Sequence, residues 1–218
     1  VVKAHAYGLG DYEIAAFLEK LGVHHFWVAD FEEGVSLRKQ GIQGSIIIAN
    51  PGSKSIDKIN SYNLEAVIYN FRLLELYANQ NTSFNIHLKL NTGMNRYGFN
   101  TEDIDDLLTL LQENPQLKVK TVCSHLAASD EIKKDGYTHC QIELFKKLTN
   151  KLQKELKTPF KRHILNTNGV LRHPQNQMEM VRTGIGLYGV SNDKNLQQIC
   201  RLESAISQIR NIKKGEKI

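Results

Sequence analysis

The sequence has 218 residues, of which 41% are hydrophobic, and carries a formal net charge of +5. This length and composition suit one large domain with a sizeable core, and no apolar run approaches the length of a transmembrane helix. The chain also opens without the charged region and apolar core of a secretory signal peptide. We therefore expect a cytoplasmic protein that does not enter a membrane.

The distribution of basic residues and cysteines excludes two further classes. The basic residues are densest from Lys146 to Arg162, where Phe145, Leu148, Leu152 and Leu156 recur at helical spacing. The lysines are therefore expected on the solvent face of one helix, and a nucleic-acid surface is disfavoured because no aromatic residues interleave with them. The cysteines are odd in number and form no close pair, which predicts reduced thiols: Cys123, Cys140 and Cys200.

Short β-branched runs recur along the chain and predict eight strands. Most are followed by a helical pattern, such as Ile104, Leu107, Leu108 and Leu111 at i, i+3, i+4 and i+7. Strands that alternate with helices predict a parallel sheet. Eight such units predict an α/β fold, a (β/α)₈ TIM-like barrel, with a doubly wound open sheet as the alternative. The predicted strands are Val1–Lys3, His25–Asp30, Ser45–Asn50, Ala66–Asn70, Asn85–Asn91, Lys120–Leu126, His163–Asn168 and Met180–Gly189.

The end of the chain has a different pattern. Leu202, Ala205, Ile206, Ile209 and Ile212 precede a Lys-Lys-Gly-Glu turn. We expect residues 1–199 to form the barrel, without the first residues of the native domain. Residues 200–218 are expected to begin a second, β-rich domain that is truncated.

Polar residues gather where the predicted strands end, which is where barrels place their chemistry. Lys3 ends the first strand, and glycine-rich turns occur at Gly8/Gly10 and Gly184/Gly186. Cationic residues beside such turns favour an anionic, phosphate-bearing ligand, and a lysine held near it can form a Schiff base. An isolated lysine at a strand end would instead be simply solvated. The other strand-end residues are Lys89, Asn91, His125, Asn166, Thr167 and Arg182.

Five motifs give these residues a family resemblance. They are VVKAHAYG at 1–8, LKLNTGMNRYGF at 88–99, SHLAASD at 124–130, His163 with Asn166-Thr167, and VRTGIGLYG at 181–189. In order and spacing they resemble the alanine racemases over nearly the whole chain. That family usually has an acidic or amide residue where this chain has His5, and serine where it has Thr167.

The resemblance implies a pyridoxal 5'-phosphate cofactor. Lys3 would hold it covalently and act as one of two catalytic bases. Arg182 would face the pyridine nitrogen and, because arginine keeps its proton, would leave that nitrogen unprotonated. Further implied cofactor-binding residues are Tyr7, His163, Asn166, Thr167, Gly184 and Ile185.

The resemblance also assigns residues around the substrate. His125 would hydrogen-bond Arg182, and His163 either supports the same network or packs as a core histidine. Arg96 would contact substrate and cofactor. Lys89 matches a lysine that is often carbamylated, although this chain has Asn91 where the family often has aspartate, and an ordinary charged lysine is an equal alternative.

The implied function is that of a bacterial homodimeric isomerase that interconverts L- and D-alanine for peptidoglycan synthesis in the cell wall. Its second base would be a tyrosine from the partner's β-rich domain, which lies beyond Ile218, so this chain is expected to lack efficient activity.

One alternative is a single-domain pyridoxal-phosphate-binding protein, and another is a related racemase or decarboxylase of another amino acid. A fusion behind a cell-wall ligase stays open. No metal site is predicted, and a metal-dependent barrel hydrolase is disfavoured because H-E-x-x-H, H-x-H and C-x-x-C are absent.

Overall fold

The fold is built on one curved parallel sheet. The computed structural model describes residues 1–191 and 193–216. The strands pair in chain order, β1-β2-β3-β4-β5-β6, and every pairing is parallel. A doubly wound sheet reverses its strand order partway, so this unbroken order selects the barrel winding. The strands are β1 His25–Val28, β2 Ser45–Ile48, β3 Glu65–Ile68, β4 Phe84–Lys89, β5 Leu117–Cys123 and β6 Lys161–His163.

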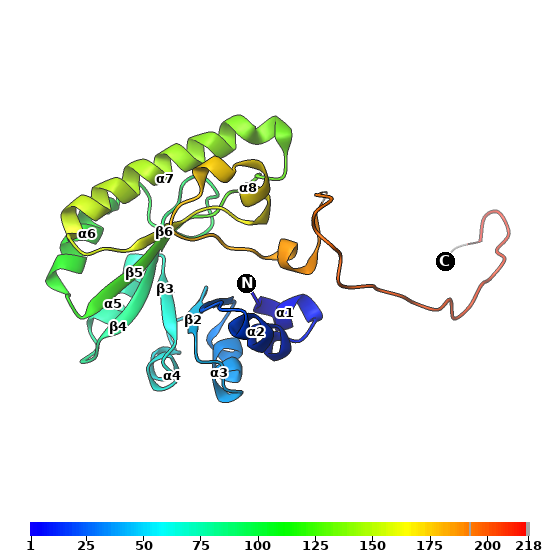
Figure 1. The fold of residues 1–218 in the computed structure, drawn as a ribbon, viewed down its shortest axis with the longest axis horizontal. Helices are drawn as coiled ribbons and strands as arrows, with labels where there is room; N and C mark the ends of the chain where they lie inside the picture. Colours follow the sequence, from blue (N-terminus) through cyan, green and yellow to red (C-terminus); the bar gives the residue numbers. More distant parts are fainter. Residues whose placement is uncertain (192, 217–218) are drawn as a thin grey trace.

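Helices connect the strands and cover the outside of the sheet (Figure 1). In Figure 1, α2 and α3 lie beside β2 in the lower part of the view, while the long helix α7 runs along the top with α6 next to it. The helices are α1 Lys3–Gly8, α2 Asp11–Lys20, α3 Phe31–Lys39, α4 Ile56–Ser61, α5 Phe71–Ala78, α6 Ile104–Glu113, α7 Asp135–Leu156 and α8 Thr167–Arg172. The 3₁₀ turns are η1 Ile132–Lys134, η2 Pro174–Asn176 and η3 Ile185–Tyr188.

Two of the eight predicted strands are wrong as secondary structure. In place of a strand at Val1–Lys3 the chain enters α1, and the predicted strand Met180–Gly189 is irregular before it becomes η3. Each segment still borders the sheet through main-chain hydrogen bonds. Val2 donates to Trp27 O (2.9 Å), and the amides of Met180 and Arg182 donate to Arg162 O (3.2 Å) and Leu165 O (3.0 Å). These few bonds do not make a ladder, so the sheet itself is a curled half-barrel.

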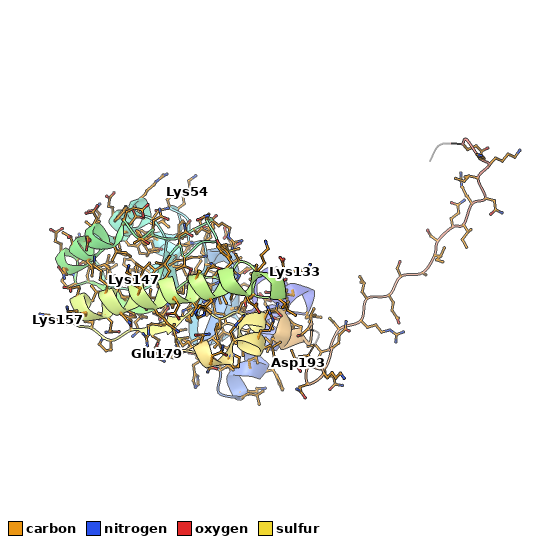
Figure 2. The ribbon with its side chains drawn as sticks, turned by 90° about the horizontal axis from the view of Figure 1, so that it is seen from above. Lys54, Lys133, Lys147, Lys157, Glu179 and Asp193 are labelled. Carbon is orange, nitrogen blue, oxygen red and sulfur yellow. The ribbon has the colours of Figure 1, made fainter. Side chains whose placement is uncertain are left out.

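The predicted helical periodicity is confirmed. The four apolar positions of α6 are all buried, and Phe145, Leu148 and Leu152 form the buried side of α7. The opposite side of α7 carries exposed lysines, and Figure 2 labels Lys147 on this helix and Lys157 just beyond its end, both exposed. The part of the basic run that lies on α7 is therefore a solvated helix face, with Lys151 paired to Asp105 of α6. Lys161 and Arg162, at the end of the run, lie instead in β6. No helix within the described residues is long and apolar enough to cross a membrane.

The described part of the tail, residues 193–216, leaves the body in an irregular path and forms no strand (Figure 1). Its large apolar residues from Ile199 onward are exposed, and Leu202 is fully so. A strand is stabilised by pairing with neighbours, and the described tail shares one main-chain hydrogen bond with the body, from the Ile199 amide to Tyr188 O (3.3 Å). The second β-rich domain therefore stays a prediction.

Candidate active site

The predicted site residues converge on one cavity of about 570 Å³ at the carboxyl ends of the strands. The volume lies in the range of small-molecule sites. Among the described residues that line it there is no aspartate or glutamate, so the cavity suits an anionic occupant. The lining residues that carry the argument are Lys3, Tyr7, Lys89, Arg96, His125, Asn166, Thr167, Arg182, Gly184 and Ile185.

Lys3 and Tyr7 enter the cavity from a left-handed turn. Four consecutive non-glycine residues of α1, Ala4 to Tyr7, have φ between 51° and 58°. Each such residue costs roughly 1–2 kcal/mol, so the turn needs support from its surroundings. Its middle residues are held by a hydrogen bond from the Ala6 amide to Val2 O (3.0 Å) and by the contact of His5 Nδ1 with the Asp11 carboxylate (2.8 Å). The position that departs from the resembling family, His5, is thus part of this support.

A hydroxyl and two glycine amides form a small cradle beside Tyr7. Thr167 Oγ1 accepts hydrogen bonds from the amides of Gly184 and Gly186, both at 3.2 Å. A Cβ on Gly186 would lie 2.3 Å from the Thr167 side chain, and one on Gly184 would lie 2.8 Å from the Tyr7 hydroxyl. The absence of a side chain at Gly186 therefore permits the close approach of Thr167. Donors gathered in this way suit a phosphate group.

Arg182 forms the inner wall of the cavity. Its guanidinium donates to the carbonyl oxygens of Ser124 (2.5 Å) and His163 (3.1 Å), and it lies 5.4 Å from the centre of the Trp27 ring. It also donates to Nδ1 of His163 and, at 3.2 Å, to Nδ1 of His125. The guanidinium is thus fixed from several sides, and the contact predicted between His125 and Arg182 is present.

Both histidines that contact Arg182 are neutral. Burial, together with the charges of Arg182, Lys89 and other nearby cations, lowers the pKa of His125 to about 3. Burial and Arg182 lower the pKa of His163 well below its usual value. Because arginine can only donate, each histidine presents an unprotonated Nδ1 to it.

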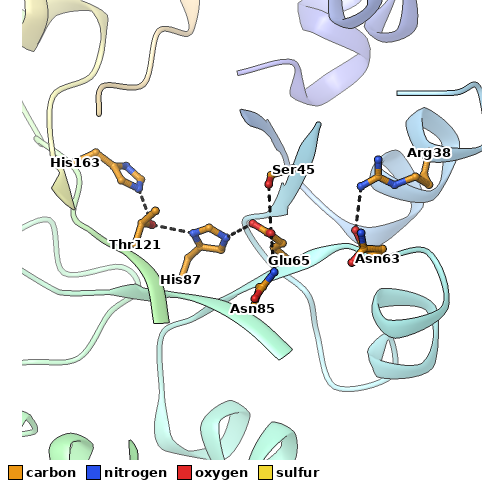
Figure 3. A network of polar contacts seen from close by, with 8 residues as sticks. All are labelled: Arg38, Ser45, Asn63, Glu65, Asn85, His87, Thr121 and His163. Carbon is orange, nitrogen blue, oxygen red and sulfur yellow. Dashed lines mark hydrogen bonds and ion pairs between the residues drawn. The ribbon is translucent and has the colours of Figure 1, made fainter. Parts of the chain in front are cut away.

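A buried chain of hydrogen bonds begins at His163, one of the partners of Arg182 (Figure 3). With its Nδ1 occupied, His163 donates from Nε2 to Thr121 Oγ1 (2.9 Å), and the Thr121 hydroxyl donates to Nδ1 of His87 (2.8 Å). His87 Nε2 then donates to Glu65 Oε2 (2.9 Å). With this order of donors and acceptors, each ring nitrogen and the Thr121 hydroxyl has a hydrogen-bond partner. The chain runs from the Arg182 cation to the Glu65 carboxylate.

Glu65 ends that chain at the start of β3. Burial is the largest single influence and raises its pKa, but it is outweighed by the hydrogen bond and charge of His87 together with the hydrogen bonds from Asn85 (3.1 Å) and Ser45 (3.3 Å). The net pKa is lowered, so Glu65 is ionised and balances buried positive charge. Sequence reasoning missed Glu65, His87 and Thr121, although polar residues inside otherwise apolar strands are a usable signal.

Lys89 and Arg96 also line the cavity. Burial lowers the pKa of Lys89, and the charges of Arg182, Arg96 and Lys3 add to this. Its ammonium lies 5.6 Å from the centre of the Tyr97 ring. The loop that carries Arg96 is organised by Asn91, whose Oδ1 accepts from the amides of Gly93 (3.1 Å) and Asn95 (3.0 Å).

The remaining predicted residues divide into two groups. Tyr7, Thr167, Gly184 and Ile185 line the cavity near one another. Asn166 also lines it, but its Oδ1 is occupied by the Gly169 amide (2.9 Å) and the Ser129 hydroxyl (2.7 Å). His163 does not line this cavity and lies behind Arg182, so the network role fits it better than direct cofactor contact. Trp27 and Cys123 line the cavity without having been predicted.

The comparisons with known proteins cover the part of the chain that forms this site. The family described as "Alanine racemase, N-terminal domain" matches residues 1–192. The alanine racemase of Fusobacterium nucleatum is 34% identical over 98% of this chain, and the match covers 61% of that protein. The chain thus spans about three fifths of this relative.

Solved structures agree with the fold. The alanine racemase of Clostridium difficile 630, in complex with cycloserine, aligns with a TM-score of 0.82 and 27% identity over 89% of this chain and 55% of that one. The alanine racemase of Bartonella henselae, with covalently bound pyridoxal phosphate, has a TM-score of 0.78 at 24% identity and covers 90% of this chain and 56% of that one. The curled half-barrel is therefore of the α/β TIM-barrel type.

Proposed function

This chain belongs to the alanine racemase N-terminal domain family, and from that membership we propose that it is the cofactor-holding barrel of an enzyme that interconverts L- and D-alanine. The observation that carries the proposal is the convergence of Lys3, Arg182 and the Thr167–Gly184 cradle in one cavity whose described lining has no carboxylate. A lysine, a fixed guanidinium and a phosphate cradle are the parts that such a cofactor needs.

The residues present fit pyridoxal phosphate. Lys3 would bind it through Nζ, and Tyr7, Thr167, Gly184 and Ile185 would hold its phosphate, where the glycines leave room for close approach. When bound, the cofactor withdraws electrons from the amino acid and so makes its Cα–H acidic. Proposed further contacts are those of Asn166 and, through Arg182, of His163.

Arg182 would determine how strongly the ring withdraws electrons. The guanidinium is permanently charged and already anchored by main-chain carbonyls, so it can donate to the pyridine nitrogen but cannot give it a proton. A ring nitrogen without a proton is a weaker electron sink, which favours return of the proton to Cα. His125 is neutral, so it accepts a hydrogen bond from the guanidinium without placing a second positive charge beside it.

Inversion at Cα needs a base on each face. Lys3 would remove or return a proton on the face it occupies. The tyrosine expected on the other face belongs to a β-rich domain of a partner subunit, so we propose that the full protein acts as a homodimer. Arg96 would bind the substrate carboxylate, since arginine pairs well with a planar anion. Bacterial origin, a cell-wall role and a cytoplasmic location belong to the same proposal.

We also propose that Lys89 is carbamylated. Its neutral amine would add to carbon dioxide to give a carbamate and one proton, and the lowered pKa of Lys89 increases the fraction of that amine. The carbamate would place a negative charge beside Arg96. Carbon-13 NMR with labelled bicarbonate tests this: a carbamate resonance that is lost in Lys89→Ala is expected, and its absence from the parent chain would refute carbamylation.

The central experiment is covalent trapping. The chain is incubated with pyridoxal phosphate, reduced with borohydride and digested for peptide mass spectrometry. The label is expected on Lys3 and is expected to be lost in Lys3→Ala, while Lys20→Ala serves as a control from the neighbouring helix. A label on another lysine would refute the assignment. Racemisation by the full-length protein, compared for alanine and other amino acids, then tests the substrate and separates a racemase from a cofactor-binding protein.

A further inference from the structure

Glu33 has an unusual pair of contacts at the start of α3. Asp30 caps this helix by accepting from the Glu33 amide (3.0 Å). In the common capping box, a glutamate at this third position reaches back to the amide of the capping residue itself. The Glu33 carboxylate instead divides between two other segments: Oε1 accepts from the Ala4 amide and Oε2 from the Ala29 amide, both at 2.7 Å.

One of these amides adjoins the proposed cofactor lysine in the chain, and the other borders its cavity. Ala4 follows Lys3 directly and is the first residue with positive φ in the left-handed turn. Ala29 follows β1 and lines the active-site cavity. One carboxylate therefore joins the start of the turn, the end of β1 and the first turn of α3, at the point where the chain enters its strained conformation.

We propose that Glu33 is a positioning residue that holds Lys3 toward the cavity, an inference that rests on the proposed function of Lys3. Hydrogen bonds to a carboxylate are short and about twice as strong as neutral ones, so they can offset part of the cost of the left-handed turn. Before Lys3, Val2 bonds to Trp27 and Ala6 through its main chain. The pair His5–Asp11 acts at a later residue of the turn. The Glu33 bond is the one that holds the residue directly after Lys3.

The competing explanation is that Glu33 only stabilises the start of α3. Glu32 supplies a matched control, because it lies in the same first turn, carries the same charge and is exposed. A loss of helix-dipole or capping energy would follow from either residue. A loss of control over Lys3 would follow only from Glu33.

The experiment compares Glu33→Ala, Glu33→Gln and Glu32→Ala with the parent chain, using amide hydrogen exchange at Ala4 and borohydride-trapped pyridoxal phosphate on Lys3. Glu33→Ala is expected to speed exchange at Ala4 and to slow labelling of Lys3, each by about tenfold or more, the loss of a charge-assisted hydrogen bond. Glu33→Gln should give exchange and labelling rates between those of the parent chain and Glu33→Ala, because the glutamine side chain keeps only one acceptor oxygen. Glu32→Ala should match the parent.

A second variant addresses the mechanism and any failure to fold. Adding Ala4→Gly to Glu33→Ala relieves the positive φ, because glycine adopts that region freely, and should restore part of the Lys3 labelling. If Glu33→Ala does not fold, Glu33→Gln decides in its place. Normal labelling in a folded Glu33 variant would overturn this inference alone. Absence of label in the parent chain would overturn the proposed function of Lys3 and this inference with it.

Discussion

At the scale of single residues, burial decides which groups around Arg182 carry charge. His125 is an ordinary histidine by type, yet its burial among cations lowers its pKa to about 3. Its Nδ1 can therefore accept from Arg182 at neutral pH. The same reasoning applies to His163, while Glu65 at the far end of the hydrogen-bonded chain stays ionised.

The lowered pKa of His125 predicts a specific pH dependence of stability. Between about pH 6.5 and pH 3 the unfolded chain binds a proton at this residue and the folded chain does not, so stability is complete above that range and falls as the pH is lowered. His125→Asn should reduce this loss by about 1–2 kcal/mol between pH 6.5 and pH 5. Urea unfolding at both pH values measures it. An unchanged pH slope in the variant would show that His125 is not the responsible group.

The hydroxyl of Thr121 is predicted to stabilise the fold through its two histidine partners. Thr121→Val keeps the shape but leaves His163 Nε2–H and His87 Nδ1 without their partner in the buried chain. The expected loss is about 1–3 kcal/mol for each group left unsatisfied. Urea midpoints measure it, with the exposed Thr109→Val as a control that should change by less than about 0.5 kcal/mol. Equal losses in the two variants would argue against the chain.

At the scale of elements, the loop after β4 shows how an amide can replace a carboxylate. Asn91 accepts hydrogen bonds from two loop amides, as an aspartate would. Its Nδ2 also donates to Asn95 Oδ1 (3.0 Å) and Asn100 Oδ1 (2.9 Å). Tyr137 of α7 donates to Gly93 O (2.5 Å) and holds the loop from outside. The departure from the family pattern at Asn91 thus keeps the loop ordered without adding charge near Lys89.

Loss of the Asn91 side chain should therefore loosen the segment that carries Arg96. In Asn91→Ala the two loop amides lose their acceptor, and tryptic cleavage after Arg96 is expected to speed up by about tenfold, in line with one or two lost hydrogen bonds. Limited proteolysis followed by mass spectrometry measures the rate. Asn60→Ala, an exposed asparagine of α4, is the control. If both variants are cut at the parent rate, Asn91 does not order the loop.

At the scale of the whole molecule, the helices bury one continuous core against the curved sheet. Phe145 of α7 is fully buried in it, whereas Phe17 of α2 is 61% exposed. Phe145→Ala should cost about 3–5 kcal/mol because it leaves a cavity in a close-packed interior. Phe17→Ala should change stability by less than about 0.5 kcal/mol. The urea midpoint reports both, and a similar effect of the two changes would contradict the packing of α7.

The sequence by itself determined the alternation of strands and helices, the solvated face of α7 and the position of His125 just after β5, because hydrophobic period and turn residues act within a few positions. It mistook the first and last segments for strands, since a strand also depends on how many bonds its neighbours supply. Only the tertiary structure decided which distant groups meet. Glu33 reaches Ala4 across 29 positions and Thr121 reaches His163 across 42. The curvature of the sheet sets these partners, and no local pattern in the chain encodes it.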